Sequence, residues 1–207
     1  MTPIVKRLLD TVLASLALVV LAPLLAALWL AVRLSSPGPA VFSQQRLGRD
    51  ERPFTIYKFR SMRTGASDAL HREYVSKMLT RAGPPTVVTN GLYKLESDPR
   101  ITPVGAWLRR TSLDELPQLV NVVRGDMSLV GPRPVLAWEA KLFDETAHVR
   151  FRVRPGLTGL WQVSGRARLT MLQALALDVE YVHRQSLWLD LSILARTVPA
   201  QMRRGTA

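Results

Sequence analysis

The chain has 207 residues, and 47% of them are hydrophobic, so it can bury the core of one domain with a small appendage. Its 28 lysines and arginines face 16 aspartates and glutamates, which gives a formal net charge of +12. That excess suits nucleic acid, an anionic membrane surface or phosphorylated substrates. Because the chain has no cysteine, disulfides, thiol nucleophiles and cysteine-bound metals are excluded.

An apolar segment without charges occupies residues 11–32. A straight helix of that length would measure about 33 Å, enough to cross a bilayer. Pro23 lies at its middle and removes a backbone hydrogen bond, so it bends or breaks the helix and leaves two halves of about 15–18 Å. Basic residues flank the segment on both sides. The positive-inside rule therefore favours a bent helix that enters and leaves through the same leaflet over a kinked single span.

We expect residues 1–35 to form this re-entrant membrane helix and residues 36–207 to form a domain on the cytoplasmic face. Two β-prone runs at 40–46 and 54–60 predict a β-hairpin. In the second run Lys58 and Arg60 share one strand face, either as a solvated basic surface or as a binding surface.

Helical periodicity predicts a helix over residues 66–82, followed by a loop at 83–91 with turn residues at both ends. Farther along, Trp107 and Leu108 are expected to anchor a helix that delivers Arg109.

The central segment 109–134 reads RRTSLDELPQLVNVVRGDMSLVGPRP. Ser112 and Glu115 have the spacing of a capping box and predict a helix from Ser112 to Arg124, with Asp114 in its first turn, where free N–H groups favour anions. The final GPRP predicts a rigid turn that presents Arg133. Spacing alone favours ordinary helix-end charges over chemistry at Asp114 and Glu115, because a capping box needs no chemistry to explain it.

The C-terminal part is predicted to be helical. A helix is expected over 135–149, and the glycine-rich turn RPGLTG at 154–159 would let backbone N–H groups approach an anion. Neither nucleotide-binding glycine fingerprint is present. Two apolar stripes at helical spacing follow, the first assigned to the core and the second either to the core or to a membrane surface. These stripes are Leu172, Leu175, Val179 and Val182, then Leu187, Leu191, Leu194 and Val198.

Several motifs in a fixed order resemble the bacterial sugar transferases, the monotopic polyprenyl-phosphate phosphoglycosyl transferases. The central SLDELPQLVNVVRGDMSLVGPRP carries the resemblance best. KRLLD, FSQQRLGRD and FTIYKFRSM precede it, with DPRITPVGAWLRR, and RPGLTGLWQVSGR follows it. The resemblance implies an α+β fold that is mainly α, with a re-entrant N-terminal helix and a compact helical catalytic domain with a small β-hairpin. Family members break that helix at a Ser-Pro pair, and the matching pair here is Ala22 and Pro23.

The resemblance also implies a reaction: transfer of a sugar-1-phosphate from a UDP-sugar to a polyprenyl phosphate, with release of UMP, at the cytoplasmic face of the bacterial inner membrane. Asp114 would be the covalent nucleophile and Glu115 a Mg²⁺ ligand. The groups that would neutralise phosphates are Lys58, Arg109, Arg133 and Arg154.

Two other functions remain open from the residues themselves. A nucleic-acid-binding protein is disfavoured because the aromatic residues do not alternate with the basic ones and no nucleic-acid motif occurs. The alternative to an enzyme is a non-catalytic membrane-anchored scaffold of a polysaccharide assembly complex. The expected partners are the UDP-sugar, the polyprenyl phosphate (undecaprenyl phosphate in the first instance) and membrane lipids. The sugar and the oligomeric state, a homo-oligomer included, stay open.

Overall fold

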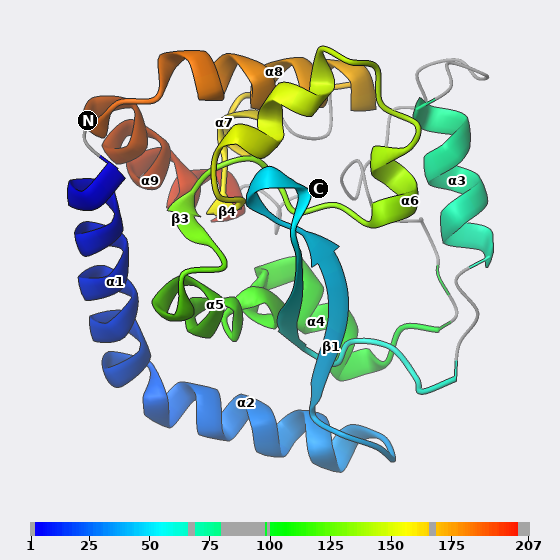
Figure 1. Ribbon diagram of the computed structural model, residues 1–207. Helices are drawn as coiled ribbons and strands as arrows, with labels where there is room; N and C mark the ends of the chain where they lie inside the picture. The colour runs from blue at the N-terminus through cyan, green and yellow to red at the C-terminus, as the bar shows by residue number, and fades with distance from the viewer. Residues whose placement is uncertain (1–2, 66–68, 80–97, 99, 166–168, 203–207) are drawn as a thin grey trace.

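The computed structural model describes residues 3–65, 69–79, 98, 100–165 and 169–202. It has a mainly helical α+β fold with two small sheets, which confirms the predicted fold class. In Figure 1 the first two helices run along two sides of the molecule, and the other elements lie inside the angle between them. The division at residue 35 stays a prediction, and the loop predicted at 83–91 lies outside the described residues.

The apolar N-terminal segment forms a bent helix pair, α1 (Pro3–Val20) and α2 (Ala22–Ser35), whose axes differ by 65°. Pro23 lies in the first turn of α2, where its missing N–H costs no helical hydrogen bond. Within the described part of the chain, no helix alone is long and apolar enough to cross a membrane, whereas this bent pair passes that test together. Both helices extend beyond the apolar run, so they measure about 27 and 21 Å and exceed the predicted halves.

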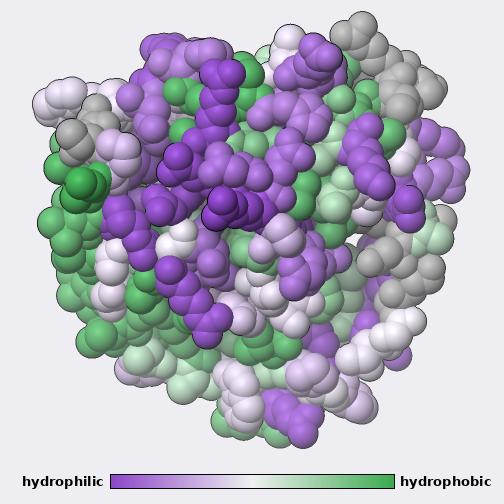
Figure 2. Space-filling view, viewed as in Figure 1, coloured by the Kyte–Doolittle hydropathy of each residue, from purple (hydrophilic) through white to green (hydrophobic). Residues whose placement is uncertain are grey.

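One face of α1 is uncovered. Its large apolar side chains recur every three or four residues and therefore share one helix face. Their exposed fractions are 80% for Ile4, 64% for Leu8, 54% for Val12, 59% for Leu16 and 73% for Val19. Figure 2 shows hydrophobic surface along the left and lower-left margin, where α1 and α2 run in Figure 1. The opposite face of α1 packs inward through Ala14, which is fully buried against the domain.

The predicted hairpin is confirmed. Strands β1 (Val41–Leu47) and β2 (Pro53–Phe59) pair antiparallel, joined by a turn that contains the short helix η1 (Arg49–Glu51). Beyond the end of β2, Arg60 donates hydrogen bonds to the carbonyl oxygens of Ser36 (2.6 Å) and Pro37 (2.7 Å). Arg60 therefore secures the exit of α2 and does not form a common binding surface with Lys58.

The predicted helix at 66–82 is confirmed in its described part as α3 (Ala69–Leu79). Helix α4 (Pro103–Thr111) is capped at its start by Thr102, whose hydroxyl accepts from the N–H of Gly105 at 3.0 Å. Leu108 is fully buried and anchors α4 as expected, whereas Trp107 is 42% exposed and does not.

The predicted capping box at Ser112 is wrong. Ser112 ends α4 in the left-handed conformation (φ 58°), and its side chain does not cap the turn that follows. A single 3-10 turn, η2 (Leu113–Glu115), follows it, and α5 (Gln118–Arg124) starts only after Pro117. Propensity favoured one continuous helix, but the left-handed residue turns the chain and separates the acidic pair from α5. The predicted stop is confirmed, because Gly125 ends α5 with φ 97°.

A two-stranded parallel sheet, β3 (Ser128–Val130) with β4 (Gly156–Thr158), crosses the middle of the domain. A Cβ added at Gly156 would lie 2.1 Å from the backbone nitrogen of Gly131. The glycines of the RPGLTG turn therefore permit close packing of two backbones. Gly131 donates its N–H to Thr158, and Gly156 donates its own to Pro132.

Polar contacts fix the start of α1 to the domain near β3 and the end of α5. Lys6 Nζ lies 2.6 Å from a carboxylate oxygen of Asp190, and Asp10 accepts from the N–H of Leu129 at 3.1 Å. Arg7 donates to two carbonyl oxygens near the end of α5, at 2.5 and 2.7 Å. Cations there complement the free carbonyls and the helix dipole. The basic flank before the apolar segment therefore anchors the helix to the domain.

The helix predicted over 135–149 is wrong. The structure has a four-residue helix α6 (Ala137–Ala140), an irregular stretch, and the 3-10 helix η3 (Ala147–Arg152). Asp144 interrupts the periodicity because its carboxylate accepts from the N–H of Ala147 at 2.9 Å and starts a new turn there.

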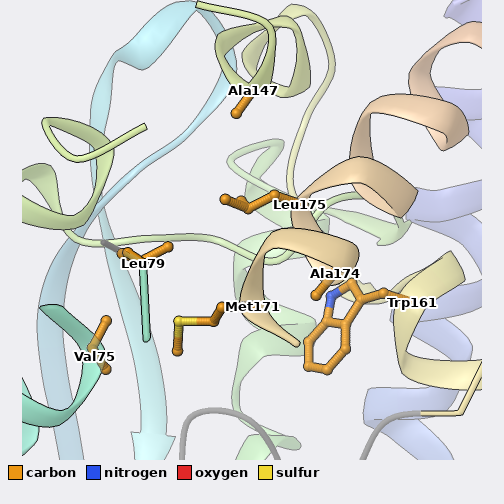
Figure 3. Packing of buried hydrophobic residues seen from close by; sticks show 7 residues of the cluster. All are labelled: Val75, Leu79, Ala147, Trp161, Met171, Ala174 and Leu175. Atoms are coloured by element: carbon orange, nitrogen blue, oxygen red, sulfur yellow. The ribbon is translucent and has the colours of Figure 1, made fainter. Parts of the chain in front are cut away.

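Three C-terminal helices complete the domain: α7 (Leu160–Val163), α8 (Met171–Arg184) and α9 (Leu187–Met202). The buried face of α8 is displaced from the predicted stripe, of which only Leu175 is buried. Figure 3 shows the cluster that α8 forms with α3, η3 and α7. On α9 the predicted stripe is partly outside the core, because Leu187 and Leu191 are 39% and 46% exposed.

Candidate active site

Three separate elements bring their charges together around Glu115. The hairpin strand β2 supplies Lys58, whose Nζ donates to Glu115 Oε1 at 3.1 Å. The loop after β3 supplies Arg133, whose Nη1 lies 3.8 Å from the same oxygen. Side-chain exposures of 18–21% leave all three groups partly open to solvent. The GPRP turn therefore presents its arginine to Glu115.

Asp114 precedes Glu115 in η2 and is 7% exposed. The negative charge of Asp114 favours the protonated forms of two cations, Lys58 and Arg109. It therefore raises the pKa of each, although both pKa values are lowered overall. Burial is the main cause of the lowered pKa in both cations. For Lys58 the charge of Glu115 opposes that effect most strongly, and that of Arg133 adds to it. The charges of both carboxylates therefore act on Lys58, and that of Asp114 acts on Arg109 as well.

A pocket with an empty volume of about 260 Å³, open solvent included, lies beside this cluster. Lys58, Glu115 and Arg133 line it, together with three residues that the sequence did not single out: Arg46, Gln118 and Gln162. Arg46 comes from the hairpin strand β1, and its Nη1 lies 3.7 Å from Glu139 Oε2. All three lie inside motifs that carry the family resemblance, but on distant segments, so nothing in the sequence connected them with one another.

A buried ion pair holds the backbone of Arg133 in place. Arg150 of η3 donates both to the carbonyl oxygen of Arg133 and to Asp178 of α8, the latter at 2.7 Å. Arg150 and Asp178 are each 2% exposed. Burial raises the pKa of Asp178 to about 6, although the Arg150 charge and the Arg133 backbone oppose that rise. η3 and α8 therefore position the backbone of Arg133, whose guanidinium faces Glu115.

The structure does not bring Arg154 into this cluster. Its Nε donates to the carbonyl oxygen of Gly125 at 2.8 Å, and Arg7, Arg49 and Asp10 are the charges that act on it. Burial lowers the pKa of the Arg154 guanidinium, and the two neighbouring arginines add to that effect. Arg154 thus lies toward the α1 side of the domain, where it joins the end of α5 to β4.

The donor set fits a Mg²⁺ ion that is held partly by substrate. Asp114 and Glu115 supply carboxylate oxygens, the ligands that this ion prefers. Within the described ranges, no group of three or more His, Cys, Asp and Glu side chains gathers to form a complete protein site. An ion bound at Glu115 would take its other oxygens from phosphates and water, which is its usual mode in phosphoryl-transfer sites.

Glu115 faces two cations in a partly open pocket and directly follows Asp114, an arrangement suited to phosphate chemistry, and the same chain carries a bent apolar helix pair. Comparison with known proteins agrees. Residues 1–204 match the family described as bacterial sugar transferase, and the chain belongs to that family.

Named relatives are similar over nearly the whole chain. The exopolysaccharide production protein ExoY of Rhizobium meliloti is 41% identical over 94% of this chain and 84% of its own length. An undecaprenyl-phosphate galactose phosphotransferase of Salmonella typhimurium is 41% identical over 98% of this chain. A UDP-glucose:undecaprenyl-phosphate glucose-1-phosphate transferase of Escherichia coli is 39% identical over 94%. The chain spans only 41% and 39% of the length of these last two proteins.

Proposed function

We propose that this protein transfers a sugar-1-phosphate from a UDP-sugar to a polyprenyl phosphate, giving a polyprenyl-diphosphate sugar and UMP. One observation supports this above the others: Glu115, which directly follows Asp114 in η2, faces Lys58 and Arg133 in one pocket. The names of the relatives support undecaprenyl phosphate as the acceptor and UDP-glucose or UDP-galactose as donors to test first. A role in exopolysaccharide synthesis agrees with the relatives named for that process.

In this proposal Asp114 is the nucleophile. A carboxylate oxygen of Asp114 attacks the phosphorus that bears the sugar, and the bond from that phosphorus to the UMP oxygen breaks. UMP leaves with the electron pair, and the sugar phosphate stays on the protein as an acyl phosphate. An oxygen of the polyprenyl phosphate then attacks the same phosphorus and releases the Asp114 carboxylate. One phosphoanhydride replaces another, so catalysis rests on positioning and charge.

The neighbouring groups have separate tasks. Lys58, Arg109 and Arg133 neutralise phosphate oxygens as charge shifts toward UMP, and the arginine fork can bind two oxygens at once. Glu115 would hold Mg²⁺, and the bound ion would supply charge stabilisation to the phosphates. We place Arg154 outside this group because its Nε is engaged with Gly125.

Membrane association fits the bent helix pair and its uncovered apolar face. We propose that the pair inserts into the cytoplasmic leaflet as a re-entrant helix, so that the pocket lies near the lipid phosphate. Cysteines placed by Thr2→Cys and Ser43→Cys test this with a membrane-impermeant thiol reagent, because the chain has no other cysteine. Both positions should stay unlabelled in intact cells and react after lysis. Labelling of Thr2→Cys from outside would establish a span.

The central experiment measures UMP release by the purified protein in detergent with Mg²⁺, undecaprenyl phosphate and a panel of UDP-sugars. UMP should form only when lipid acceptor, metal and one matching donor are present. Folded protein that stays silent across a broad panel, including in a complementation assay, would favour the scaffold alternative.

Two variants test the assigned roles. Asp114→Asn should abolish turnover and prevent radiolabelled sugar phosphate from remaining on the protein, and turnover near the wild-type level would end the nucleophile assignment. Glu115→Gln should raise the Mg²⁺ concentration needed for half-maximal activity about tenfold or more. The reason is that Glu115 is the only carboxylate among the described residues that line this pocket. An unchanged metal titration would remove Glu115 as a ligand. Glu145→Gln serves as the matched control, because Glu145 is an exposed carboxylate outside the pocket.

A further inference from the structure

Two buried glutamines line the pocket beside Glu115. Gln118 belongs to the first turn of α5 and is 3% exposed, and Gln162 belongs to α7 and is 5% exposed. The two segments lie 44 positions apart in the chain, yet both side chains border the pocket that Lys58 and Arg133 line. The charges of the pocket account for phosphate binding, but they leave these neutral amides without a task.

Each of these amides has one polar atom without a hydrogen bond partner in the protein: Nε2 of Gln118 and Oε1 of Gln162. Buried polar groups are nearly always paired, and an unmet one weakens the fold. A methionine or leucine would fill the same space without that cost. Two such groups at one pocket point to a partner that the protein itself does not supply.

We propose that Gln118 and Gln162 bind the uncharged, hydroxyl-bearing part of the donor that adjoins its phosphates. Phosphate oxygens can only accept from the amide N–H and offer nothing to the carbonyl oxygen of Gln162. A sugar or nucleoside offers both donors and acceptors, so it matches one unmet N–H and one unmet carbonyl oxygen. This inference rests on the proposed transferase function and adds the residues that read the donor.

The test uses Gln118→Met and Gln162→Met in the full chain, because methionine keeps the volume and removes the hydrogen bonds. Since neither unmet atom stabilises the protein, each variant should melt at or above the wild-type temperature. Loss of one hydrogen bond to a neutral ligand should raise the donor KM about 5- to 10-fold. Gln45→Met is the control: Gln45 is exposed on β1 and bonds to Thr55, so the donor KM should not change.

Binding of UMP, measured by calorimetry, identifies which part of the donor is read. If the affinity for UMP falls by the same factor as the donor KM rises, the glutamines bind the nucleoside. If UMP binds as it does to the wild type while the donor KM rises, they bind the sugar. Wild-type donor KM in both variants would overturn the proposal, as would a lower melting temperature with reduced kcat and an unchanged donor KM. A wild-type protein that neither turns over nor binds UMP refutes the proposed function itself, and this inference with it.

Discussion

The Arg150–Asp178 pair offers the sharpest test of how the pocket is held. Arg150→Met leaves an unbranched apolar side chain in place but removes the guanidinium, and with it the charge and the cation–π contacts with the Phe143 and Phe151 rings. The variant leaves a buried carboxyl without its cation and the Arg133 carbonyl without its donor. Breaking a buried pair in this way costs about 3–5 kcal/mol. For a chain of this size about 1 kcal/mol shifts the melting temperature by roughly 2–4 °C, so a fall of about 6–20 °C is expected.

The loss should depend on pH, and the raised pKa of Asp178 fixes the direction. The folded-state pKa of Asp178, about 6, exceeds its ordinary value of 3.8. The protonated carboxyl therefore stabilises the fold fully below about pH 4, and this stabilisation is lost as the pH rises through 6. Arg150 opposes this rise, so Arg150→Met should push the pKa of Asp178 still higher and extend the loss above pH 6. At pH 5 the carboxyl is protonated in both proteins, and only the lost hydrogen bonds remain, about 1–3 kcal/mol.

Thermal unfolding in detergent, at pH 5 and pH 8, measures both quantities. The gap between wild type and Arg150→Met should widen from pH 5 to pH 8. Arg184→Met is the matched control, because Arg184 pairs with Glu180 on the same helix as Asp178 but is 66% exposed. Exposed pairs contribute about 0–1 kcal/mol, so this control should shift by only a few degrees. An equal gap at both pH values, or a gap no larger than that of the control, would refute the reasoning.

Two further predictions concern the pocket and its support. Burial lowers the pKa of Lys58 from its usual 10.5, so turnover should decline on the alkaline side as Lys58 loses its proton. Lys58→Arg should move that decline to higher pH in a pH–rate profile, because a guanidinium stays charged there; a limb at the same pH would assign the decline to another group. Gly156→Ala would place a Cβ 2.1 Å from the backbone nitrogen of Gly131. The added Cβ forces β3 and β4 apart, which should lower the free energy of unfolding by about 3 kcal/mol. An unchanged melting temperature would show that the strands separate freely.

Local patterns in the sequence determined much of the fold. The alternation in residues 40–60 was sufficient to predict the hairpin, since strand pairing there is between neighbours in the chain. Pro23 was sufficient to predict the bend, because proline cannot continue a helix but is tolerated in the first turn of the next one. The stop at Gly125 followed from the left-handed conformation that glycine adopts easily. Where local rules competed, they failed: Ser112 has the residue type of a cap but ends the preceding helix instead.

The site divides in the same way. Asp114, Glu115 and Arg133 belong to one motif, so the sequence already connected them. The strand pattern left Lys58 either on a solvated basic surface or on a binding surface, and the family resemblance favoured a phosphate-binding role. The hairpin fold is what brings it to Glu115.

Tertiary structure alone decided the other assignments. Arg154 and Arg60 are basic residues in motifs like the rest, yet the fold commits each to backbone carbonyl oxygens away from the pocket. Gln118 and Gln162 carry no signal of their own in the sequence. Only the tertiary structure shows that each is buried with one polar atom that has no hydrogen bond partner in the protein. Sequence fixes residue types and short-range conformation, whereas burial and long-range pairing arise only when distant segments pack together.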